Sequence, residues 1–548
     1  MNAKVRAHFA VVITFLFCIN LSVASSSVQN SPQTLVGVTE LISVASDGTQ
    51  GNWGSNYSSI SADGRYVAFS SVSSNLVAGD TNGSNDVFVH DRVTGVTTRV
   101  SVASDGMQGN GDSGDYTLSI SADGRYVAFT SEASNLVVGD TYLCSHPKLP
   151  LYNCADVFVH DRVTGETTRV SVASDGTQAN SESWLSSMSA DGRYVAFGST
   201  ATNLVVGDTN GSSDVFIHDL VTGETTCVSV ASDGTQGNYS SGGNSISADG
   251  RYVAFISAAS NLVVGDTNDT YDSFVHDRMT GETTHLSVAS DGTQGNMGSW
   301  SPSISADGRY VAFTSEASNL VAGDTNGLED IFMHDRQTGE TTRVSLASDG
   351  SQANDLSRNP SISADGRFVA FSSDASNMVV GDTNGVIDVF VHDRLTGETT
   401  RLSVSSDGMQ GNKASGFTGI SISVNGRYVA FDSVSTNLVV GDTNDTTDIF
   451  VRDREGLVVD YSVSGHVTGL GGNPFPGANI SAGYGYSAIT DSQGDYTITG
   501  LQSGTYWVTA SLTDSSFIPF RRTVSVPPER VGINFTEGFP AFLPLIGR

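Results

Sequence analysis

The sequence predicts an all-β protein in which a seven-bladed β-propeller is followed by a small β-sandwich. A segment reading Ser-Ala-Asp-Gly-Arg-Tyr-Val-Ala-Phe at 61–69 occurs, with small changes, in seven copies along the chain. The composition of the 548 residues, with 60 Gly and 8% aromatic residues, is typical of a turn-rich folded protein and not of a disordered acidic one. The repeat ends near residue 460, where a second domain is expected.

Each repeat is predicted to form four short strands. A Ser-Ile-Ser run and the Arg-Tyr-Val-Ala-Phe run flank an Asp-Gly pair, which favours a two-residue hairpin. The third strand is of the type at 214–219, and a Thr-Gly-Glu turn leads to a fourth of the type Thr-Thr-Arg-Val-Ser-Val. The hairpin aspartate recurs every 58 to 68 residues, at Asp63, Asp123, Asp191, Asp249, Asp307 and Asp365, with Asn425 in the seventh copy. Such units stack best in a radial propeller, where each blade covers its neighbours.

Closure of the ring is also predicted. The seventh unit supplies only three strands, ending at Asp453, whereas a fourth-strand sequence stands at the N-terminus at 39–44. We therefore expect the N-terminal strand to complete the last blade, and we place the propeller at 31–456.

These repeats resemble those of TolB-like, WD-repeat-like bacterial propellers, because the hairpin at 61–69 is followed by Asp-Val-Phe-Val-His-Asp at 86–91. The resemblance extends over seven copies and implies a bacterial β-propeller; because TolB itself has six blades, it does not extend to the partners of TolB.

After the repeats, residues 460–537 resemble the carboxypeptidase regulatory-like domain, a prealbumin-like β-sandwich. Ser-Gly-His-Val-Thr at 464–468, Asp-Ser-Gln-Gly-Asp-Tyr at 491–496 and Gly-Thr-Tyr-Trp-Val at 504–508 occur in the order of that family. The resemblance implies a spacer, stalk or docking module without catalytic residues. The apolar tail at 538–548 is either an export or attachment signal or a packed chain end.

The first 24 residues are predicted to be a secretory signal peptide. Lys4 and Arg6 precede an apolar stretch that is too short for a comfortable membrane span, and Ser-Val-Ala at 22–24 is a small-residue cleavage site. An uncleaved anchor is the alternative. In an oxidising compartment, Cys144 and Cys154, ten residues apart in an insertion, are expected to form a disulfide. We expect a secreted protein at the cell surface, outside the cell or in the periplasm.

Charge excludes several classes of partner. With 58 acidic against 27 basic residues, the formal net charge is −31, and no cluster of Lys and Arg is available to neutralise phosphates. We therefore expect no nucleic-acid partner. No later segment reaches the length of a transmembrane helix, so we expect no span in the mature chain, and we expect a monomer.

The repeat varies in length only in the connections from the fourth strand to the next first strand and from the second to the third. These connections emerge on one face of a propeller, and variation confined to one face commonly marks a binding surface. Aromatic side chains suited to stacking on sugars or gripping a partner gather there. The candidate ligand-binding residues are Trp53, Tyr57, Tyr116, Trp184, Tyr239, Trp300 and Phe417. The alternative is that their rings fill gaps between neighbouring loops.

The second-to-third connection repeats Gly-Asp-Thr-Asn-Gly-x-x-Asp, whose oxygens are of the kind that Ca²⁺ takes. The candidate ligands are Asp80, Asn82, Asp86, Asp208, Asn210, Asp214, Asp266, Asn268, Asp272, Asp324, Asn326, Asp330, Asp382, Asn384, Asp388, Asp442, Asn444 and Asp448. Bound Ca²⁺ would relieve repulsion among crowded carboxylates. The alternative is that Asp and Asn form Asx turns that hold a tight connection.

We find no catalytic residues in the sequence. A histidine recurs at the end of the third strand in six repeats and is replaced by Arg452 in the seventh, which indicates a structural role. The sequence favours non-catalytic binding of a polysaccharide or a cell-envelope protein by the variable face. The alternatives are a polysaccharide-active lyase or hydrolase with its site in the propeller mouth, and a purely structural surface protein.

Overall fold

The computed structural model describes 37–144, 152–455, 461–483, 486–501, 504–512, 516–518, 521–526 and 532–538. The predicted signal peptide at 1–24 and the apolar tail beyond residue 538 lie outside these residues. In the part of the chain that is described, every regular element is a β-strand, and no helix long and apolar enough to cross a membrane occurs.

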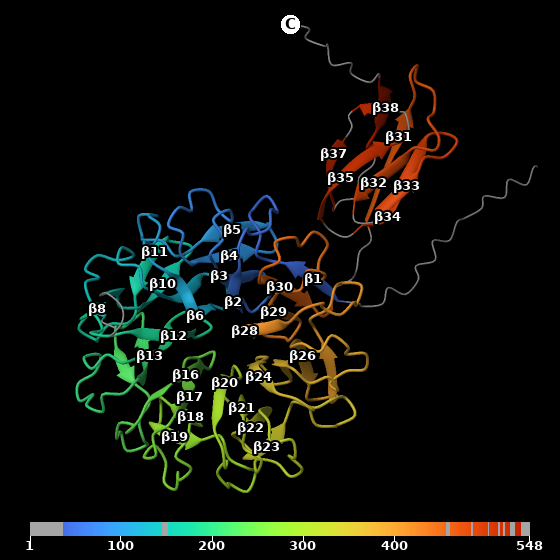
Figure 1. Ribbon diagram of the computed structural model, residues 1–548. Helices are drawn as coiled ribbons and strands as arrows, with labels where there is room; N and C mark the ends of the chain where they lie inside the picture. Colours follow the sequence, from blue (N-terminus) through green and yellow to red (C-terminus); the bar gives the residue numbers. More distant parts are fainter. Residues whose placement is uncertain are drawn as a thin grey trace, which may run out of the picture. The chain divides into compact units, whose positions relative to one another are not determined.

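Seven four-stranded antiparallel sheets are arranged around a central axis (Figure 1). The first and innermost strands are β2 (Ser55–Ile60), β6 (Ser113–Ile120), β12 (Ser183–Met188), β16 (Ser241–Ile246), β20 (Ser299–Ile304), β24 (Ser357–Ile362) and β28 (Ser415–Ile422). The second strands are β3 (Tyr66–Ser71), β7 (Tyr126–Ser131), β13 (Tyr194–Ser199), β17 (Tyr252–Ser257), β21 (Tyr310–Ser315), β25 (Phe368–Ser373) and β29 (Tyr428–Ser433).

The remaining strands of each blade lie further from the axis. The third strands are β4 (Asp86–Asp91), β10 (Asp156–Asp161), β14 (Asp214–Asp219), β18 (Asp272–Asp277), β22 (Asp330–Asp335), β26 (Asp388–Asp393) and β30 (Asp448–Asp453). The fourth strands are β5 (Val96–Arg99), β11 (Glu166–Arg169), β15 (Thr225–Cys227), β19 (Glu282–His285), β23 (Glu340–Arg343), β27 (Glu398–Arg401) and β1 (Val38–Leu41). The insertion of blade two adds a two-stranded ladder of β8 (Leu143–Cys144) and β9 (Tyr152–Asn153).

The ring closes as the sequence predicts. Strand β1 pairs with β30 in the seventh blade, with Val38 opposite Asp453 and Leu41 opposite Phe450. On the axis, the hairpins between first and second strands are joined by seven backbone hydrogen bonds of 2.9–3.2 Å. They run from the N–H of one residue to the carbonyl of the next in the order Ala62, Ala122, Ala190, Ala248, Ala306, Ala364, Val424 and back to Ala62. This cycle fixes the number of blades at seven.

The Asp-Gly-Arg-Tyr motif holds neighbouring blades together. The Asp63 carboxylate accepts hydrogen bonds from the Ser61 hydroxyl and the Arg65 N–H, which closes the hairpin. Arg65 donates two hydrogen bonds of 2.9 and 2.7 Å to Asp91 and lies over the ring of Tyr66. That ring in turn packs on Gly124 of the next blade, where a Cβ atom would meet it at 2.1 Å. The motif is therefore an inter-blade joint.

The centre of each blade is packed with apolar side chains. A phenylalanine from the second strand faces one from the third, as in Phe69 and Phe88, whose ring centroids lie 5.8 Å apart. Both side chains are fully buried, and valine and alanine residues of adjacent blades fill the space between the sheets.

The chain after residue 460 forms two four-stranded sheets with a core of their own, as expected of a small sandwich. One sheet contains β31 (Tyr461–Thr468), β34 (Asp495–Leu501), β36 (Ser516–Ile518) and β38 (Phe535–Gly538). The other contains β32 (Asn479–Gly483), β33 (Tyr486–Ile489), β35 (Gly504–Ser511) and β37 (Arg521–Val526).

Candidate functional site

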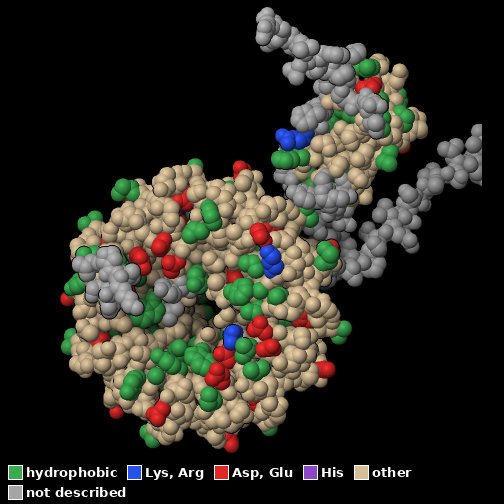
Figure 2. Space-filling model, in the orientation of Figure 1, with side chains coloured by type: hydrophobic (Ala, Val, Ile, Leu, Met, Phe, Trp, Pro, Cys, Tyr) green, Lys and Arg blue, Asp and Glu red, His purple; other side chains and the backbone are tan. Residues whose placement is uncertain are grey.

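The propeller has two chemically different faces. One, which we call the loop face, is formed by the connections from fourth to first strands and from second to third strands, such as 42–54 and 72–85. The other, the turn face, is formed by the hairpins and tight turns such as 61–65 and 92–95. Thirteen arginines lie on the turn face: six of Asp-Gly-Arg segments, Arg427 of the Asn-Gly-Arg segment, and six of Asp-Arg pairs. On the loop face, acidic side chains outnumber Lys and Arg, and hydrophobic side chains gather around the hollowed centre (Figure 2).

The predicted aromatic residues divide into exposed and packed groups. Trp53, Tyr239 and Phe417 are 60%, 61% and 50% exposed, respectively. Trp184 and Trp300 are half-buried. The indole of Trp184 covers Gly198, and that of Trp300 covers Gly298.

Tyr57 is also half-buried, and it packs against the core between blades one and two. The side chain of Tyr116 lies outside the described part of the structure. The contacts of Tyr57, Trp184 and Trp300 therefore agree with the alternative, in which the rings fill gaps between neighbouring parts of the chain. The exposed rings of Trp53, Tyr239 and Phe417 remain available to a ligand.

All seven innermost strands carry a β-bulge in the half nearest the loop face. At the bulge, three residues other than glycine take left-handed backbone angles, with φ of 48° at Tyr57, 50° at Ser301 and 55° at Asn359. Bulges and left-handed residues cost free energy and concentrate where a side chain must be aimed. We therefore take the mouth of the propeller, which is the centre of the loop face surrounded by these bulges, as the candidate site.

A shallow cavity opens on this face at the junction of blades six and seven. Arg358, Asn359 and Asp374 line it from one blade, and Gly416 and Phe417 from the next. Burial, followed by the nearby charge of Asp355, raises the pKa of Asp374. Only Phe417 of these residues is predicted from the sequence, because the others occupy variable positions without a recurring motif.

On another part of the loop face, four carboxylates crowd together near the insertion of blade two. Burial raises the pKa of Glu132, and the charges of Asp112, Asp115 and Glu182 add to that effect. Burial also raises the pKa of Asp115, and the charge of Asp112 acts in the same direction. This part of the loop face is therefore an unfavourable environment for a polyanion.

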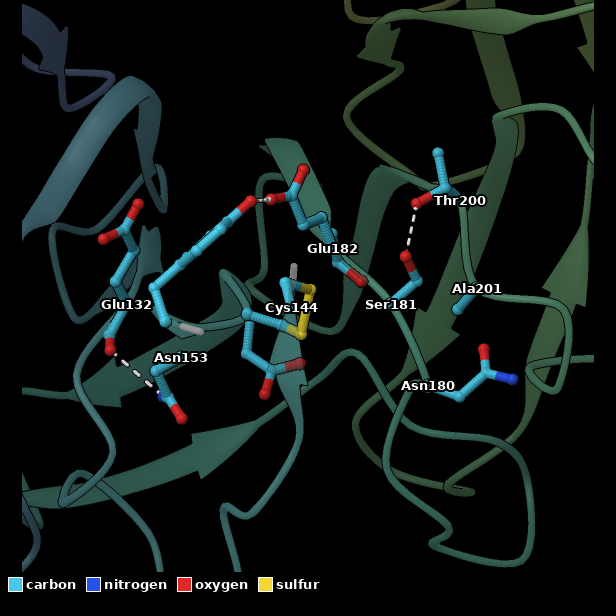
Figure 3. Close-up of a disulfide and its surroundings, with 12 residues drawn as sticks. Glu132, Cys144, Asn153, Asn180, Ser181, Glu182, Thr200 and Ala201 are labelled. Carbon is cyan, nitrogen blue, oxygen red and sulfur yellow. Dashed lines mark hydrogen bonds between the residues drawn. A yellow bond between two sulfur atoms is a disulfide. The ribbon is translucent and has the colours of Figure 1, made fainter. Parts of the chain in front are cut away.

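The insertion itself is tied down by covalent and polar contacts (Figure 3). Cys144 and Cys154 form a disulfide with their Cα atoms 5.0 Å apart. Next to it, the hydroxyl of Tyr152 donates a hydrogen bond to Glu182 of blade three, and Asn153 donates one to the carbonyl of Glu132. The insertion thus bridges two blades at the edge of the acidic cluster.

The oxygens of the Asp-Thr-Asn-Gly loops have protein partners. In blade one, Gln108 Nε2 donates to both Asp80 and Asp86, at 2.8 and 2.9 Å. Arg99 Nη1 lies 3.5 Å from Asp80 and 3.4 Å from Asp86. The Asn82 side-chain oxygen accepts the N–H of Ser84, which is an Asx turn.

The glutamine bridge recurs in all seven blades, through Gln50, Gln108, Gln178, Gln236, Gln294, Gln352 and Gln410. The arginine recurs in four, as Arg99, Arg169, Arg343 and Arg401. In three of those blades, those of Arg99, Arg343 and Arg401, a guanidinium supplies the positive charge that Ca²⁺ was predicted to supply, which favours a turn over a cation site there. Among the described residues, no group of three or more His, Cys, Asp and Glu is positioned to hold a metal ion.

The recurring histidines have structural partners. His90 Nδ1 lies 2.9 Å from the Thr97 hydroxyl, which donates in turn to the carbonyl of Val44 from the preceding connection. Burial lowers the pKa of His90, so the ring is held neutral inside the blade. Arg452, in the equivalent position of blade seven, donates to the Thr39 hydroxyl.

Comparison with known proteins identifies the second domain. Residues 462–536 match the carboxypeptidase regulatory-like domain family. The comparison with curated proteins gives no match.

Solved propellers resemble the chain at low identity. The oligogalacturonate lyase from Vibrio parahaemolyticus is 13% identical, the match covers 77% of this chain and 92% of that one, and the TM-score is 0.43. TolB from Acinetobacter baumannii is 16% identical over 64% of this chain and 82% of its own, with a TM-score of 0.33. The propeller domain of the trilobed protease from Pyrococcus furiosus is 10% identical over 73% and 95%, with a TM-score of 0.43. These similarities concern the fold and carry no functional argument.

Proposed function

We propose that the protein is a non-catalytic binding protein that acts outside the cytoplasm and holds a polysaccharide on the loop face of its propeller. The observation that carries the proposal is the set of exposed aromatic rings on that face, those of Trp53, Tyr239 and Phe417. An exposed ring offers a flat apolar surface for the C–H face of a sugar. Binding is favourable because it removes both apolar surfaces from water.

Two further features support this role. The Cys144–Cys154 disulfide is of the kind that persists in oxidising compartments. The sandwich at 461–538 would serve as a spacer or dock, because modules of this type commonly have no catalytic role of their own.

The test is an array of plant and bacterial polysaccharides probed with residues 25–548. We expect the wild-type protein to bind at least one polysaccharide without releasing soluble products, and a Trp53→Ala, Tyr239→Ala double variant to lose that binding. Trp507→Ala is the matched control, because Trp507 is an exposed tryptophan of the sandwich. Equal binding by the wild type and the double variant would refute the proposal, and binding only to cell-envelope proteins would replace the polysaccharide by a protein partner.

A polysaccharide-cleaving enzyme is the second candidate, and the acidic cluster favours it. A carboxyl with a raised pKa, such as that of Glu132, can act as a general acid on a glycosidic bond. Release of reducing or unsaturated ends by the wild type, lost in Glu132→Gln, would establish this candidate and exclude simple binding.

A further inference from the structure

The cavity at the junction of blades six and seven combines an aromatic platform with polar groups of both charges. Phe417 comes from β28, and Arg358, Asn359 and Asp374 come from β24 and the end of β25. It is a site shared by two blades.

Phe417 is held in place by a buried carboxylate that the other blades lack. The two oxygens of Asp432 accept the N–H groups of Phe417 and Thr418, at 3.2 and 3.0 Å. Asp432 is fully buried, although its register position on the second strand holds Ser, Thr, Gly or Ile in the other blades. A buried acid is costly unless hydrogen bonds stabilise it, so this one fixes the longer bulge that presents the phenyl ring to solvent.

Gly416 brings the backbone of β28 against side chains of blade six. By strand register, Gly416 occupies the position that Trp300 occupies in blade five, because Ser415 pairs with Ser433 as Ser299 pairs with Ser315. A Cβ atom at Gly416 would lie 2.8 Å from a methyl of Val389, so no side chain fits there. Where blade five carries an indole, this junction has only a glycine, whose backbone lines the cavity.

The polar groups are aimed by neighbouring elements. The Arg358 side chain is paired with Glu329 from the preceding blade, which orients the guanidinium. Asn359 has a left-handed backbone with φ of 55°, a conformation that asparagine tolerates better than most residues. The cavity therefore offers donors from a guanidinium and an amide and acceptors from Asp374, beside an apolar ring.

We propose that this cavity binds one neutral pyranose residue of a polysaccharide, with the sugar ring stacked on Phe417 and its hydroxyls bound by Arg358 and Asp374. The proposal rests on the proposed function, because it names a subsite of the same face. A sugar carboxylate is disfavoured, since Glu329, Asp355 and Asp374 outnumber the single guanidinium in and around the cavity. A neutral sugar can both accept hydrogen bonds from Arg358 and donate them to Asp374.

The test is calorimetric titration of residues 25–548 with four hexasaccharides: β-1,4-glucan, β-1,4-mannan, β-1,4-xylan and α-1,4-galacturonan. We expect at least one neutral hexasaccharide to bind and the galacturonan to bind at least about tenfold more weakly. Phe417→Ala and Arg358→Ala should each weaken the neutral ligand about tenfold, whereas Phe417→Tyr, which keeps the ring, should stay within about twofold.

Two controls separate this subsite from the face as a whole. Lys413→Ala removes another cation of the loop face, paired with Asp445 outside the cavity, and should leave affinity unchanged. Unchanged melting temperatures would show that the variants fold. Wild-type affinity in both Phe417→Ala and Arg358→Ala would overturn the subsite, and it would leave the proposed function intact if the Trp53, Tyr239 variant still loses binding. Preference for the galacturonan, or no binding of any neutral hexasaccharide, would also overturn it.

Discussion

At the scale of single residues, the recurring motif is explained by contacts between blades. The glycine after each hairpin aspartate has positive φ, and in each blade it lies against the aromatic ring of the preceding blade. Gly124, with φ of 74°, lies against the ring of Tyr66, and the guanidinium groups of Arg65 and of Arg162 from the next blade both lie over this ring. The Arg-Tyr-Arg stack is therefore built on a position where only glycine fits.

We predict that Gly124→Ala destabilises the propeller much more than Gly139→Ala. Both glycines have φ near +80°, but a Cβ atom at Gly139 would meet no atom within 4 Å, whereas one at Gly124 would clash with Tyr66. Gly139→Ala should cost about 1 kcal/mol from backbone strain alone, and Gly124→Ala about 1–3 kcal/mol more. The free energies of unfolding in urea measure the difference, and equal values would contradict the proposed joint.

At the scale of elements, the N-terminal segment closes the ring of blades. Besides the pairing of β1 with β30, Glu40 forms an ion pair with Arg92 of blade one, and Ile42 is buried between blades one and seven. The segment therefore contacts both sides of the seam at which the chain closes.

Ile42→Ala is expected to lower the free energy of unfolding by about 2–5 kcal/mol, because it leaves a cavity at the seam. Val93→Ala, in an exposed turn, is the control and should change it by less than about 0.5 kcal/mol. Denaturant titration measures both, and a small effect of Ile42→Ala would show that the seam is closed by other contacts.

The stability of the propeller should depend on pH because of a buried aspartate at the same seam. Burial raises the pKa of Asp448 to about 6, although Ser43 and Gln50 donate hydrogen bonds to it. Between pH 4 and pH 6 the folded state then holds a proton that the unfolded state releases, so stability falls as the pH rises through this window. In Asp448→Asn, stability should therefore change less with pH than in the wild type. Asp105→Asn, a substitution in an exposed turn, should leave the pH dependence unchanged. Melting temperatures at pH 4.5 and 7 test the prediction, and identical slopes for wild type and Asp448→Asn would refute it.

At the scale of the whole molecule, side chains inside the propeller bind its buried carboxylates and so reduce the repulsion between them. The buried aspartate that begins each third strand, such as Asp86, is bound by a glutamine and a serine, and in four blades by an arginine as well. The acidic side chains of the loop face are left unbalanced, which gives the two faces different electrostatic characters.

Calcium sites in the Asp-Thr-Asn-Gly loops remain a prediction that thermal unfolding can test. Because glutamine and arginine already bind these carboxylates, we expect millimolar Ca²⁺ to shift the melting temperature no more than Mg²⁺ does. A single site filled at 100 times its dissociation constant would add about 2.7 kcal/mol, so several sites would raise the melting temperature by many degrees. A large calcium-specific shift, reversed by chelator, would establish the loops as metal sites.

The sequence by itself determined the repeat, the four strands of each blade, the closing strand and the sandwich. These features follow from local chemistry: the Asp-Gly pair favours a tight turn, and the short runs of apolar residues that form the strands are recognised over a few residues. The candidate aromatics could also be placed on one face, because loop lengths show which connections vary.

Only the tertiary structure decided which of those residues face a ligand. Trp184 and Trp300 cover glycines whereas Trp53 stays exposed, and the sequence around each gives no sign of the difference. The partner of Asp442 is Gln50, nearly four hundred residues earlier in the chain, and Arg358 and Phe417 meet across a blade junction. Contacts made by ring closure depend on the packing of separate blades, and for that reason no local pattern in the chain encodes them.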